Sequence, residues 1–289
     1  MTIATIDIGG TGIKFASLTP DGKILDKAST PTPETLEDLL AWLDQRLSER
    51  DYRGIAMSVP GAVNQETGMI EGISAIPYIH GFSWYEVLAH HQLPIHLEND
   101  ANCVGLSELL AHPEIENAAC VVIGTGIGGA MIINGKLHRG RHGLGGEFGY
   151  MTTIEPAEKL NNWSLLASTG NMVRYVIEKS GRSDWDGRKV YQEAAAGNAL
   201  CQEAIERMNR NLAQGLLNIQ YLIDPDVISL GGSISQNPDF IKGVQKAVDV
   251  FVERYEEYTI APVIQACTYQ ADANLYGALV NWLQEENQW

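Results

Sequence analysis

The sequence predicts an α/β fold made of two similar units that face each other across a common cleft. An apolar strand, a glycine turn and a second apolar strand occur twice, as IDIGGTGIKF at residues 6–15 and as VIGTGIGGAMI at residues 122–132. Each copy is followed by helical and strand-like segments, which is typical of α/β proteins. The length of 289 residues suits one large domain or two moderate ones.

The first half of the chain reads as three strands, a helix, two more strands and a second helix. A glycine turn at residues 9–12 and a Pro-Asp-Gly turn at residues 20–22 separate the first three strands. Leucines at helical spacing follow Pro33, and residues 64–85 are rich in loop signals. The expected strands are residues 3–8, 13–18, 23–29, 53–61 and 94–98, and the expected helices are residues 33–50 and the segment after Asp100.

The second half repeats the opening pattern at residues 118–137 and continues into a glycine-rich loop at residues 139–150. Residues 164–223 are mostly helical in pattern, and a double glycine ends the apolar segment DVISLGG. The remaining expected elements are strands at residues 226–232 and 262–267 and helices at residues 238–255 and 272–284.

The charge balance excludes several classes of partner. With 36 acidic and 20 basic residues the net charge is −16, which argues against binding to nucleic acid or to an anionic membrane surface. No apolar run approaches the ~20 residues of a membrane helix, and the N-terminus lacks the basic start and apolar core of a secretion signal. A cytoplasmic protein is expected.

The cysteines predict free thiols. Cys103, Cys120, Cys201 and Cys267 are scattered and form no C-x-x-C pair, as in proteins of a reducing compartment. A zinc site needs clustered ligands, which these cysteines do not supply, and the histidines are poor candidates as well. We therefore predict no zinc site.

The glycine turns are candidate phosphate sites. Backbone N–H groups of Gly9, Gly10 and Gly12 could converge on an anion, with the Thr11 hydroxyl and the Lys14 ammonium nearby. Asp7, just before the turn, could hold a hydrated Mg²⁺ that the phosphates also bind. Either turn alone could be an ordinary β-hairpin, but a third double glycine after a buried strand strengthens the phosphate interpretation. The corresponding residues of the later segments are Gly124, Thr125, Gly126 and Gly128, and then Gly231 and Gly232.

Glu98, Asn99 and Asp100 lie side by side where a strand meets a helix. Asp and Asn favour helix starts because their side-chain oxygens accept backbone N–H groups that lack partners. Taken alone, the segment favours a helix cap at Asp100 over a catalytic carboxylate.

These motifs, in this order, resemble the ROK family of sugar kinases over nearly the whole chain. DIGGTGIK and GTGIGGAMIINGKLHRG resemble its two phosphate motifs, ENDANC its catalytic segment, GEFGY its sugar-binding segment and ISLGGSI its adenosine motif. The resemblance implies an actin-like ATPase (ribonuclease H-like) fold with two lobes around a nucleotide and sugar cleft. It implies a first lobe of residues 1–115 joined by the C-terminal helix 271–289, and a second lobe of residues 116–270. ATP with Mg²⁺ as cofactors and a homodimer are also implied.

The resemblance assigns roles to single residues. Asp100 would be the general base that takes the proton of a sugar 6-hydroxyl, and Asn99 would bind neighbouring hydroxyls. Glu98 is expected to support the loop or face away. Asp7 would act on Mg²⁺ through the ATP phosphates. The other implied contacts are Gly9, Gly10, Thr11, Lys14, Gly124, Thr125, Gly126, Gly128, Gly231 and Gly232 for the nucleotide, and Gly61, Glu147, Tyr150 and Ser164 for the sugar.

Two departures from the family bear on the substrate. Tyr150 stands where many members have histidine, and residues 151–171 lack the cysteines of the family's zinc loop. Ser164 stands near the position of a second sugar-binding glutamate. Loss of that glutamate relaxes the demand for a free C1 hydroxyl, which favours a β-glucoside kinase over an N-acetylmannosamine kinase, a glucokinase or a fructokinase.

Two non-enzymatic alternatives remain. One is a sugar-responsive ROK regulator, although no DNA-binding segment fits before Asp7. The other is a catalytically inactive sugar-binding protein, which the intact Asp100 argues against. Trp84 and Trp163 are expected to be core or interface residues more often than sugar platforms.

Overall fold

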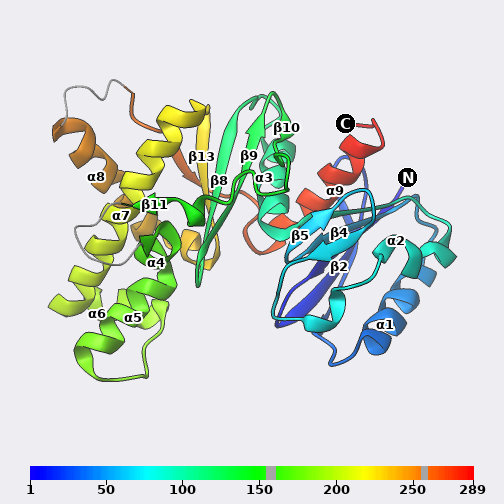
Figure 1. Ribbon diagram of the computed structural model, residues 1–289, viewed down its shortest axis with the longest axis horizontal. Coiled ribbons are helices and arrows are strands. Elements are labelled where there is room, and N and C mark those ends of the chain that lie inside the picture. The colour runs from blue at the N-terminus through cyan, green and yellow to red at the C-terminus, as the bar shows by residue number, and fades with distance from the viewer. Residues whose placement is uncertain (154–160, 255–259) are drawn as a thin grey trace. The chain divides into compact units, whose positions relative to one another are not determined.

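The computed structural model describes residues 1–153, 161–254 and 260–289, which form two compact units (Figure 1). Unit 1 comprises Met1–Glu114, Arg139–Gly145 and Ala271–Trp289, and unit 2 comprises Ile115–His138 and Gly146–Gln270. The sequence did not predict that residues 139–145 group with unit 1. They do so because the side chain of Arg139 forms ion pairs with Glu98 and Glu285 of that unit.

The sheet of unit 1 has the strand order β3-β2-β1-β4-β7. The first three strands are antiparallel, and β1, β4 and β7 run parallel. Its central strand is buried throughout, as expected for a strand that is covered on both faces. The strands are β1 (Ile3–Ile8), β2 (Gly12–Leu18), β3 (Ile24–Pro31), β4 (Ile55–Val59) and β7 (Ile95–Asn99), with a separate hairpin of β5 (Ala62–Asn64) and β6 (Met69–Glu71).

Helices cover this sheet with their apolar stripes. In α1 (Leu36–Ser48) the buried residues Leu39, Leu43 and Leu47 follow helical spacing, and Thr35 caps the helix. The other helical elements of unit 1 are α2 (Trp84–Val87), α3 (Asp100–Ala111), α9 (Ala273–Glu285) and the short 3₁₀ turns η1 (Pro77–Ile79), η2 (Ala89–His91) and η5 (Gln270–Asp272), the last of which begins one residue before this unit.

Helices α3 and α9 approach closely at Gly277. A Cβ atom built on Gly277 would lie 1.7 Å from the carbonyl oxygen of Cys103, so only glycine permits this contact. We expect Gly277→Ala to lower the free energy of unfolding by about 1–3 kcal/mol because the two helices must move apart. Urea denaturation would measure the change. Gly124→Ala is the control, because its Cβ would meet no atom within 4 Å; equal stabilities of the two variants would contradict the argument.

Unit 2 repeats the arrangement with the strand order β10-β9-β8-β13-β14. Again an antiparallel hairpin leads into parallel strands, because β8 pairs antiparallel with β9 and parallel with β13. The internal repeat inferred from the two glycine turns is therefore real at the level of topology. The strands are β8 (Ala118–Ile123), β9 (Ile127–Ile133), β10 (Lys136–Leu137), β13 (Val227–Gly231) and β14 (Ile264–Ala266), with a separate pair of β11 (Thr152–Thr153) and β12 (Asn161–Asn162).

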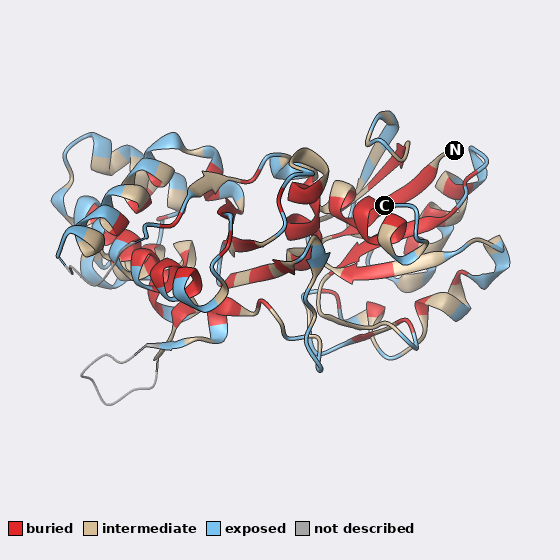
Figure 2. Cartoon of the chain, turned by 90° about the horizontal axis from the view of Figure 1, so that it is seen from above, coloured by how far each residue is buried: buried red, intermediate tan, exposed pale blue. Residues whose placement is uncertain are grey.

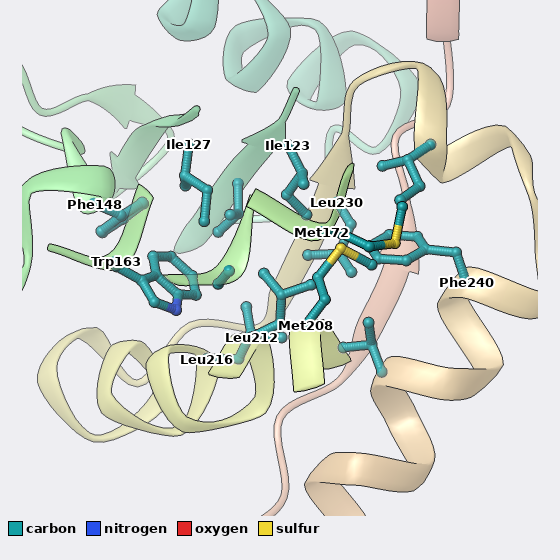
Figure 3. Packing of buried hydrophobic residues seen from close by; sticks show 14 of the residues in the cluster. Ile123, Ile127, Phe148, Trp163, Met172, Met208, Leu212, Leu216, Leu230 and Phe240 are labelled. Atoms are coloured by element: carbon teal, nitrogen blue, oxygen red, sulfur yellow. The ribbon is translucent and has the colours of Figure 1, made fainter. Parts of the chain in front are cut away.

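The core of unit 2 forms between its sheet and a helical layer (Figure 3). Trp163 is fully buried there, donates its indole N–H to the carbonyl of Asn211 and packs so close to Gly215 that a side chain at position 215 would collide with it. Trp84 is likewise fully buried in the core of unit 1, so both tryptophans are core residues, as expected. The helices are α4 (Trp163–Ala167), α5 (Thr169–Ser180), α6 (Gly187–Ala195), α7 (Ala199–Ile223) and α8 (Pro238–Arg254), with 3₁₀ turns η3 (Phe148–Tyr150) and η4 (Ser233–Gln236).

Burial follows the elements as the sequence pattern predicted. Figure 2 shows buried residues along the strands and the inner helix faces, with exposed residues on the outer faces. Within the described ranges, no helix has the length and apolar character needed to cross a membrane.

Candidate active site

The candidate base Asp100 is the first residue of α3, directly after β7. The helix cap is Asn99, whose side-chain oxygen accepts the N–H groups of Ala101 (2.9 Å) and Asn102 (3.2 Å). The cap expected at Asp100 is therefore wrong by one residue, because Asn caps a helix as well as Asp does. This register frees the side chain of Asp100 from capping the helix; its carboxylate accepts the N–H of Ala101 (2.8 Å) and a hydrogen bond from Asn99.

The surroundings of Asp100 favour its neutral form. Burial raises the pKa of this carboxyl above its ordinary value of 3.8, and the negative charge of Asp7 adds to the shift. Hydrogen bonds from Ala101 and Asn99 oppose it only in part. A raised pKa brings a carboxylate closer to the strength that a general base needs near neutral pH.

This shift predicts a pH-dependent stability difference. Because the pKa is raised in the folded state, the contribution of Asp100 to stability is present below pH 3.8 and is lost as pH rises through the folded pKa. The amide of Asp100→Asn has no such titration. We therefore expect the variant to gain stability relative to the parent as pH rises, measured by urea denaturation between about pH 4 and pH 8. A difference that stays constant across this range would contradict the shift.

Glu98 supports the catalytic segment from beneath, as expected. Its side chain is 2% exposed, and Oε1 accepts the backbone N–H of Asn99 (2.8 Å) and the amide of Asn102 (2.9 Å). The other oxygen, Oε2, accepts the Nε–H of Arg139 at 2.6 Å. One buried carboxylate thus holds residues on both sides of Asp100.

Arg139 was missed by the sequence reasoning. Its guanidinium also donates to Asn281 (2.7 Å) and Glu285 (2.9 Å) of α9. Burial alone would lower the pKa of Arg139, but the carboxylates of Glu98 and Glu285 outweigh it and raise the pKa. The arginine is therefore a fixed cation that joins residue 98 to the C-terminal helix. The only sequence signal was a basic residue at the start of a glycine-rich loop.

The first glycine turn joins β1 to β2 and is open to solvent. The N–H of Gly9 donates to the carbonyl of Gly12 (3.1 Å), while Gly10 and Thr11 are exposed. A Cβ on Gly9 would lie 2.9 Å from the oxygen of Gly12, so a side chain would crowd the turn. The turn therefore presents bare backbone, which a phosphate can approach.

Asp7 lies opposite Lys14 in the hairpin and is 7% exposed. Its Oδ2 accepts from the Lys14 ammonium (3.1 Å), and its Oδ1 accepts from Ser58 (3.3 Å) and from the Asn274 amide (3.0 Å). Oδ1 accepts two hydrogen bonds and Oδ2 accepts one, so Oδ2 keeps a lone pair that could accept from a water of a hydrated Mg²⁺. The ammonium of Lys14 also donates to the carbonyl of Ala271, so its charge is partly satisfied within the unit. Ser58 and Asn274 were not predicted from sequence.

Gly61 lies beside the catalytic segment. Its carbonyl accepts the side-chain N–H of Asn99 (3.0 Å), and its φ of +103° is one that glycine adopts without strain. The side-chain oxygen of Asn99 therefore accepts the N–H groups of the helix, and its amide nitrogen donates to Gly61 and to the Asp100 carboxylate. A sugar hydroxyl that binds this amide would have to replace one of these contacts.

The second glycine turn joins β8 to β9. Gly124, Thr125 and Gly126 are exposed, and the N–H of Gly124 donates to the carbonyl of Gly126 (2.9 Å). Gly128 lies within β9 opposite Val122, beyond the turn itself.

Ser164 anchors this turn. Its hydroxyl accepts the N–H of Ile127 (2.7 Å) and donates to the carbonyl of the same residue (3.2 Å). A Cβ on Gly149 would lie 2.5 Å from this hydroxyl, which places η3 against the same point. The serine predicted to contact the sugar thus already uses its proton on the backbone.

Two of the residues predicted to contact the sugar lie in the segment GEFGY, residues 146–150. Glu147 is half-buried at the start of η3, and Tyr150 is 72% exposed. The predicted absence of a zinc loop concerns residues 151–171, of which residues 154–160 lie outside the described part of the chain.

A cavity of about 540 Å³ lies beside the double glycine of β13. Gly232 has φ +88° and approaches Ile123 so closely that a Cβ would lie 2.1 Å from its carbonyl oxygen. Ser233, the next residue, lines the cavity together with Thr169 and Tyr191. The hydroxyls of Thr169 and Tyr191 are buried without a hydrogen-bond partner among the described residues. Since buried polar groups are nearly always paired, these hydroxyls fit a ligand with polar edges, such as adenosine. Asp186, Arg188, Gln236 and Asn237 add further polar lining.

Comparison with known proteins covers both units. A sequence profile of the ROK family matches residues 3–285. The β-glucoside kinase of Listeria monocytogenes is 36% identical over 100% of this chain and 99% of its own, and that of Klebsiella pneumoniae is 31% identical over 98% and 97%. The crystal structure of a ROK family protein from Streptococcus pneumoniae TIGR4 in complex with sucrose is 88% identical, covers 100% of both chains and superposes with a TM-score of 0.98.

Proposed function

The chain belongs to the ROK family, and from this premise we propose that it is an ATP-dependent kinase that phosphorylates the 6-hydroxyl of a hexose or hexoside. The observation that carries the proposal is Asp100. Its carboxylate lies at the start of α3. Burial and the negative charge of Asp7, beside the first glycine turn, raise its pKa. That is the place and the environment of a general base next to a phosphate site.

In the proposed reaction, Asp100 accepts the proton of the 6-hydroxyl as the sugar oxygen bonds to the γ-phosphorus of ATP. The bond from that phosphorus to the β-phosphate oxygen breaks, and ADP leaves. Backbone N–H groups of the turns at Gly9–Gly12 and Gly124–Gly126 would hold the phosphates. Mg²⁺ held through Asp7 would neutralise charge on the phosphates. Asn99 would orient the sugar through its side-chain amide, in place of its contact with Asp100.

A β-glucoside is the proposed substrate. The curated relatives from Listeria and Klebsiella are β-glucoside kinases. The Streptococcus relative holds sucrose, an α-glucoside, which supports a substituent at C1 but not its β configuration. Ser164 supports this proposal, because its short side chain is tied to Ile127 and leaves no carboxylate to demand a free C1 hydroxyl. N-acetylmannosamine, glucose and fructose are the alternatives.

A coupled ADP-release assay with ATP and Mg²⁺ tests the proposal. The sugars are cellobiose and a second β-glucoside, sucrose, N-acetylmannosamine, glucose and fructose. We expect the highest kcat/KM for a β-glucoside. A higher value for N-acetylmannosamine or glucose would overturn the substrate assignment but leave the kinase assignment in place. If none of these sugars causes release of ADP, while calorimetry still shows sugar binding, an inactive sugar-binding protein would be favoured.

The cavity beside Gly232 is the proposed adenosine site. Tyr191→Phe removes a buried hydroxyl that has no partner in the described part of the chain, so we expect stability to change by less than about 1 kcal/mol. The KM for ATP should rise about 3- to 10-fold, as for one lost hydrogen bond, with the KM for sugar unchanged. Tyr175→Phe is the control, because that hydroxyl is exposed on α5 and bonds to Glu203. An unchanged KM for ATP in Tyr191→Phe would remove this hydroxyl from the site.

Two further expectations accompany the proposal. By family resemblance the protein would act as a homodimer, which light scattering in solution would test. A regulatory role without catalysis would instead show as sugar binding with no ATP turnover.

A further inference from the structure

Three side chains of metal-ligating type converge in unit 1 and are separate from the residues of the candidate active site. Asp44 comes from α1, and His90 and His91 come from η2, 46 and 47 residues later in the chain. Their ligand atoms all lie within 4.8 Å of one another. The sequence analysis judged the histidines poor zinc candidates, and Asp44 was not considered with them.

A single carboxylate oxygen faces both imidazoles. Asp44 Oδ1 lies 3.1 Å from Nε2 of His90 and 2.8 Å from Nε2 of His91. The ring centroids lie 4.1 Å apart, and the ring planes are tilted by 39° to each other. The two nitrogens and the oxygen therefore offer three convergent ligand atoms to one cation.

The tautomer of His90 indicates which of its nitrogens is available to a metal ion. Its Nδ1 lies 3.1 Å from the carbonyl oxygen of Val87, so Nδ1 carries the proton that is donated there. In the neutral ring, Nε2 then presents a lone pair to a carboxylate oxygen, which is unfavourable unless a cation lies between them. A histidine whose second nitrogen donates to a backbone carbonyl is the usual arrangement at metal sites.

We propose that Asp44, His90 and His91 form a site for a divalent transition metal, with Zn²⁺ as the best fit. Two imidazole nitrogens and one carboxylate oxygen form a common zinc ligand set, and water would complete the tetrahedron. His91 is half-buried, whereas His90 is exposed, so the site is open to solvent on one side. Mg²⁺ prefers oxygen ligands and does not fit two imidazoles. The bound metal would tie η2 to α1 on the surface of unit 1.

Calorimetry and Co²⁺ spectroscopy on untagged protein test the proposal. We expect one equivalent of Zn²⁺ to bind, and Co²⁺ to give the visible absorption of a four-coordinate site that Zn²⁺ then removes. His91→Gln and Asp44→Asn should each weaken Zn²⁺ binding at least tenfold. His112→Gln is the matched control, because His112 also lies near a carboxylate, that of Glu114 at 3.5 Å, but has no second histidine there.

Thermal unfolding separates loss of the site from loss of folding. Zn²⁺ should raise the Tm of the parent and of His112→Gln but not that of His91→Gln, while Mg²⁺ raises none of them through this site. Circular dichroism confirms that each variant is folded. Absence of Zn²⁺ binding to the parent, or equal Zn²⁺ binding by His91→Gln and the parent, would overturn the proposal. In either case a proton would be the cation that the two histidines share.

Discussion

Asp100→Asn should reduce kcat for sugar phosphorylation about 10²- to 10⁴-fold, since an amide cannot accept the proton of the sugar hydroxyl. The variant should fold normally, because the cap of α3 belongs to Asn99 and the amide oxygen can still accept the N–H of Ala101. The ADP-release assay measures the loss, and calorimetry should show sugar affinity within about threefold of the parent.

The control is Asp38→Asn. Asp38 also lies in the first turn of a helix of unit 1, but it is exposed and bonds only locally to Thr35. Its removal should leave kcat unchanged. If Asp100→Asn retained more than about a tenth of the parent kcat, Asp100 would be a structural residue and another base would be required.

Arg139→Met should give the second large effect. It leaves the Glu98 carboxylate buried without its cationic partner, and we expect the free energy of unfolding to fall by about 1–3 kcal/mol. Because Glu98 holds the backbone of Asn99 and the side chain of Asn102, we also expect Asp100 to lose its alignment. The expected cost is about 10- to 10²-fold in kcat, with little change in the KM for ATP. Urea denaturation and steady-state kinetics measure the two effects.

Two further variants, Arg139→Lys and Arg141→Met, distinguish the effect of the charge at residue 139 from the effect of its hydrogen-bond geometry. Arg141 lies in the same loop, is exposed and forms no ion pair with a described residue, so its loss should change neither property. Lysine at position 139 can pair with Glu98 but cannot also reach Asn281 and Glu285 as a fork, so it should restore stability more than kcat. If Arg139→Met lost stability while kcat stayed at the parent value, the arginine would be structural and would not position Asp100.

The repeated α/β fold was predictable because its signals are local. The leucines of α1 follow helical spacing, and the glycine turns interrupt apolar strands at the points where the structure has hairpins. Asp100 could also be proposed as a candidate base from the sequence, since it lies in a short motif. The error of one residue in the helix cap arose because Asn99 and Asp100 are both good caps, and only the backbone geometry distinguishes them.

The supporting residues could not be read from the sequence. Arg139 contacts Glu98 from 41 residues away, and Asn274 contacts Asp7 from 267 residues away. No periodicity or motif links such pairs, because they meet only after the sheet of unit 1 has formed. The same holds for Tyr191, whose unpartnered hydroxyl becomes informative only when burial is known.

The central claim is that the chain transfers phosphate to the 6-hydroxyl of a glucoside. The most direct measurement is the structure of the product of a reaction with ATP and cellobiose, determined by correlating ³¹P and ¹H resonances in NMR spectra. We predict one phosphate on C6 of the non-reducing glucose ring, with the glycosidic bond intact and no product from Asp100→Asn. Phosphate on any other position, or cleavage of the bond at C1, would contradict the account.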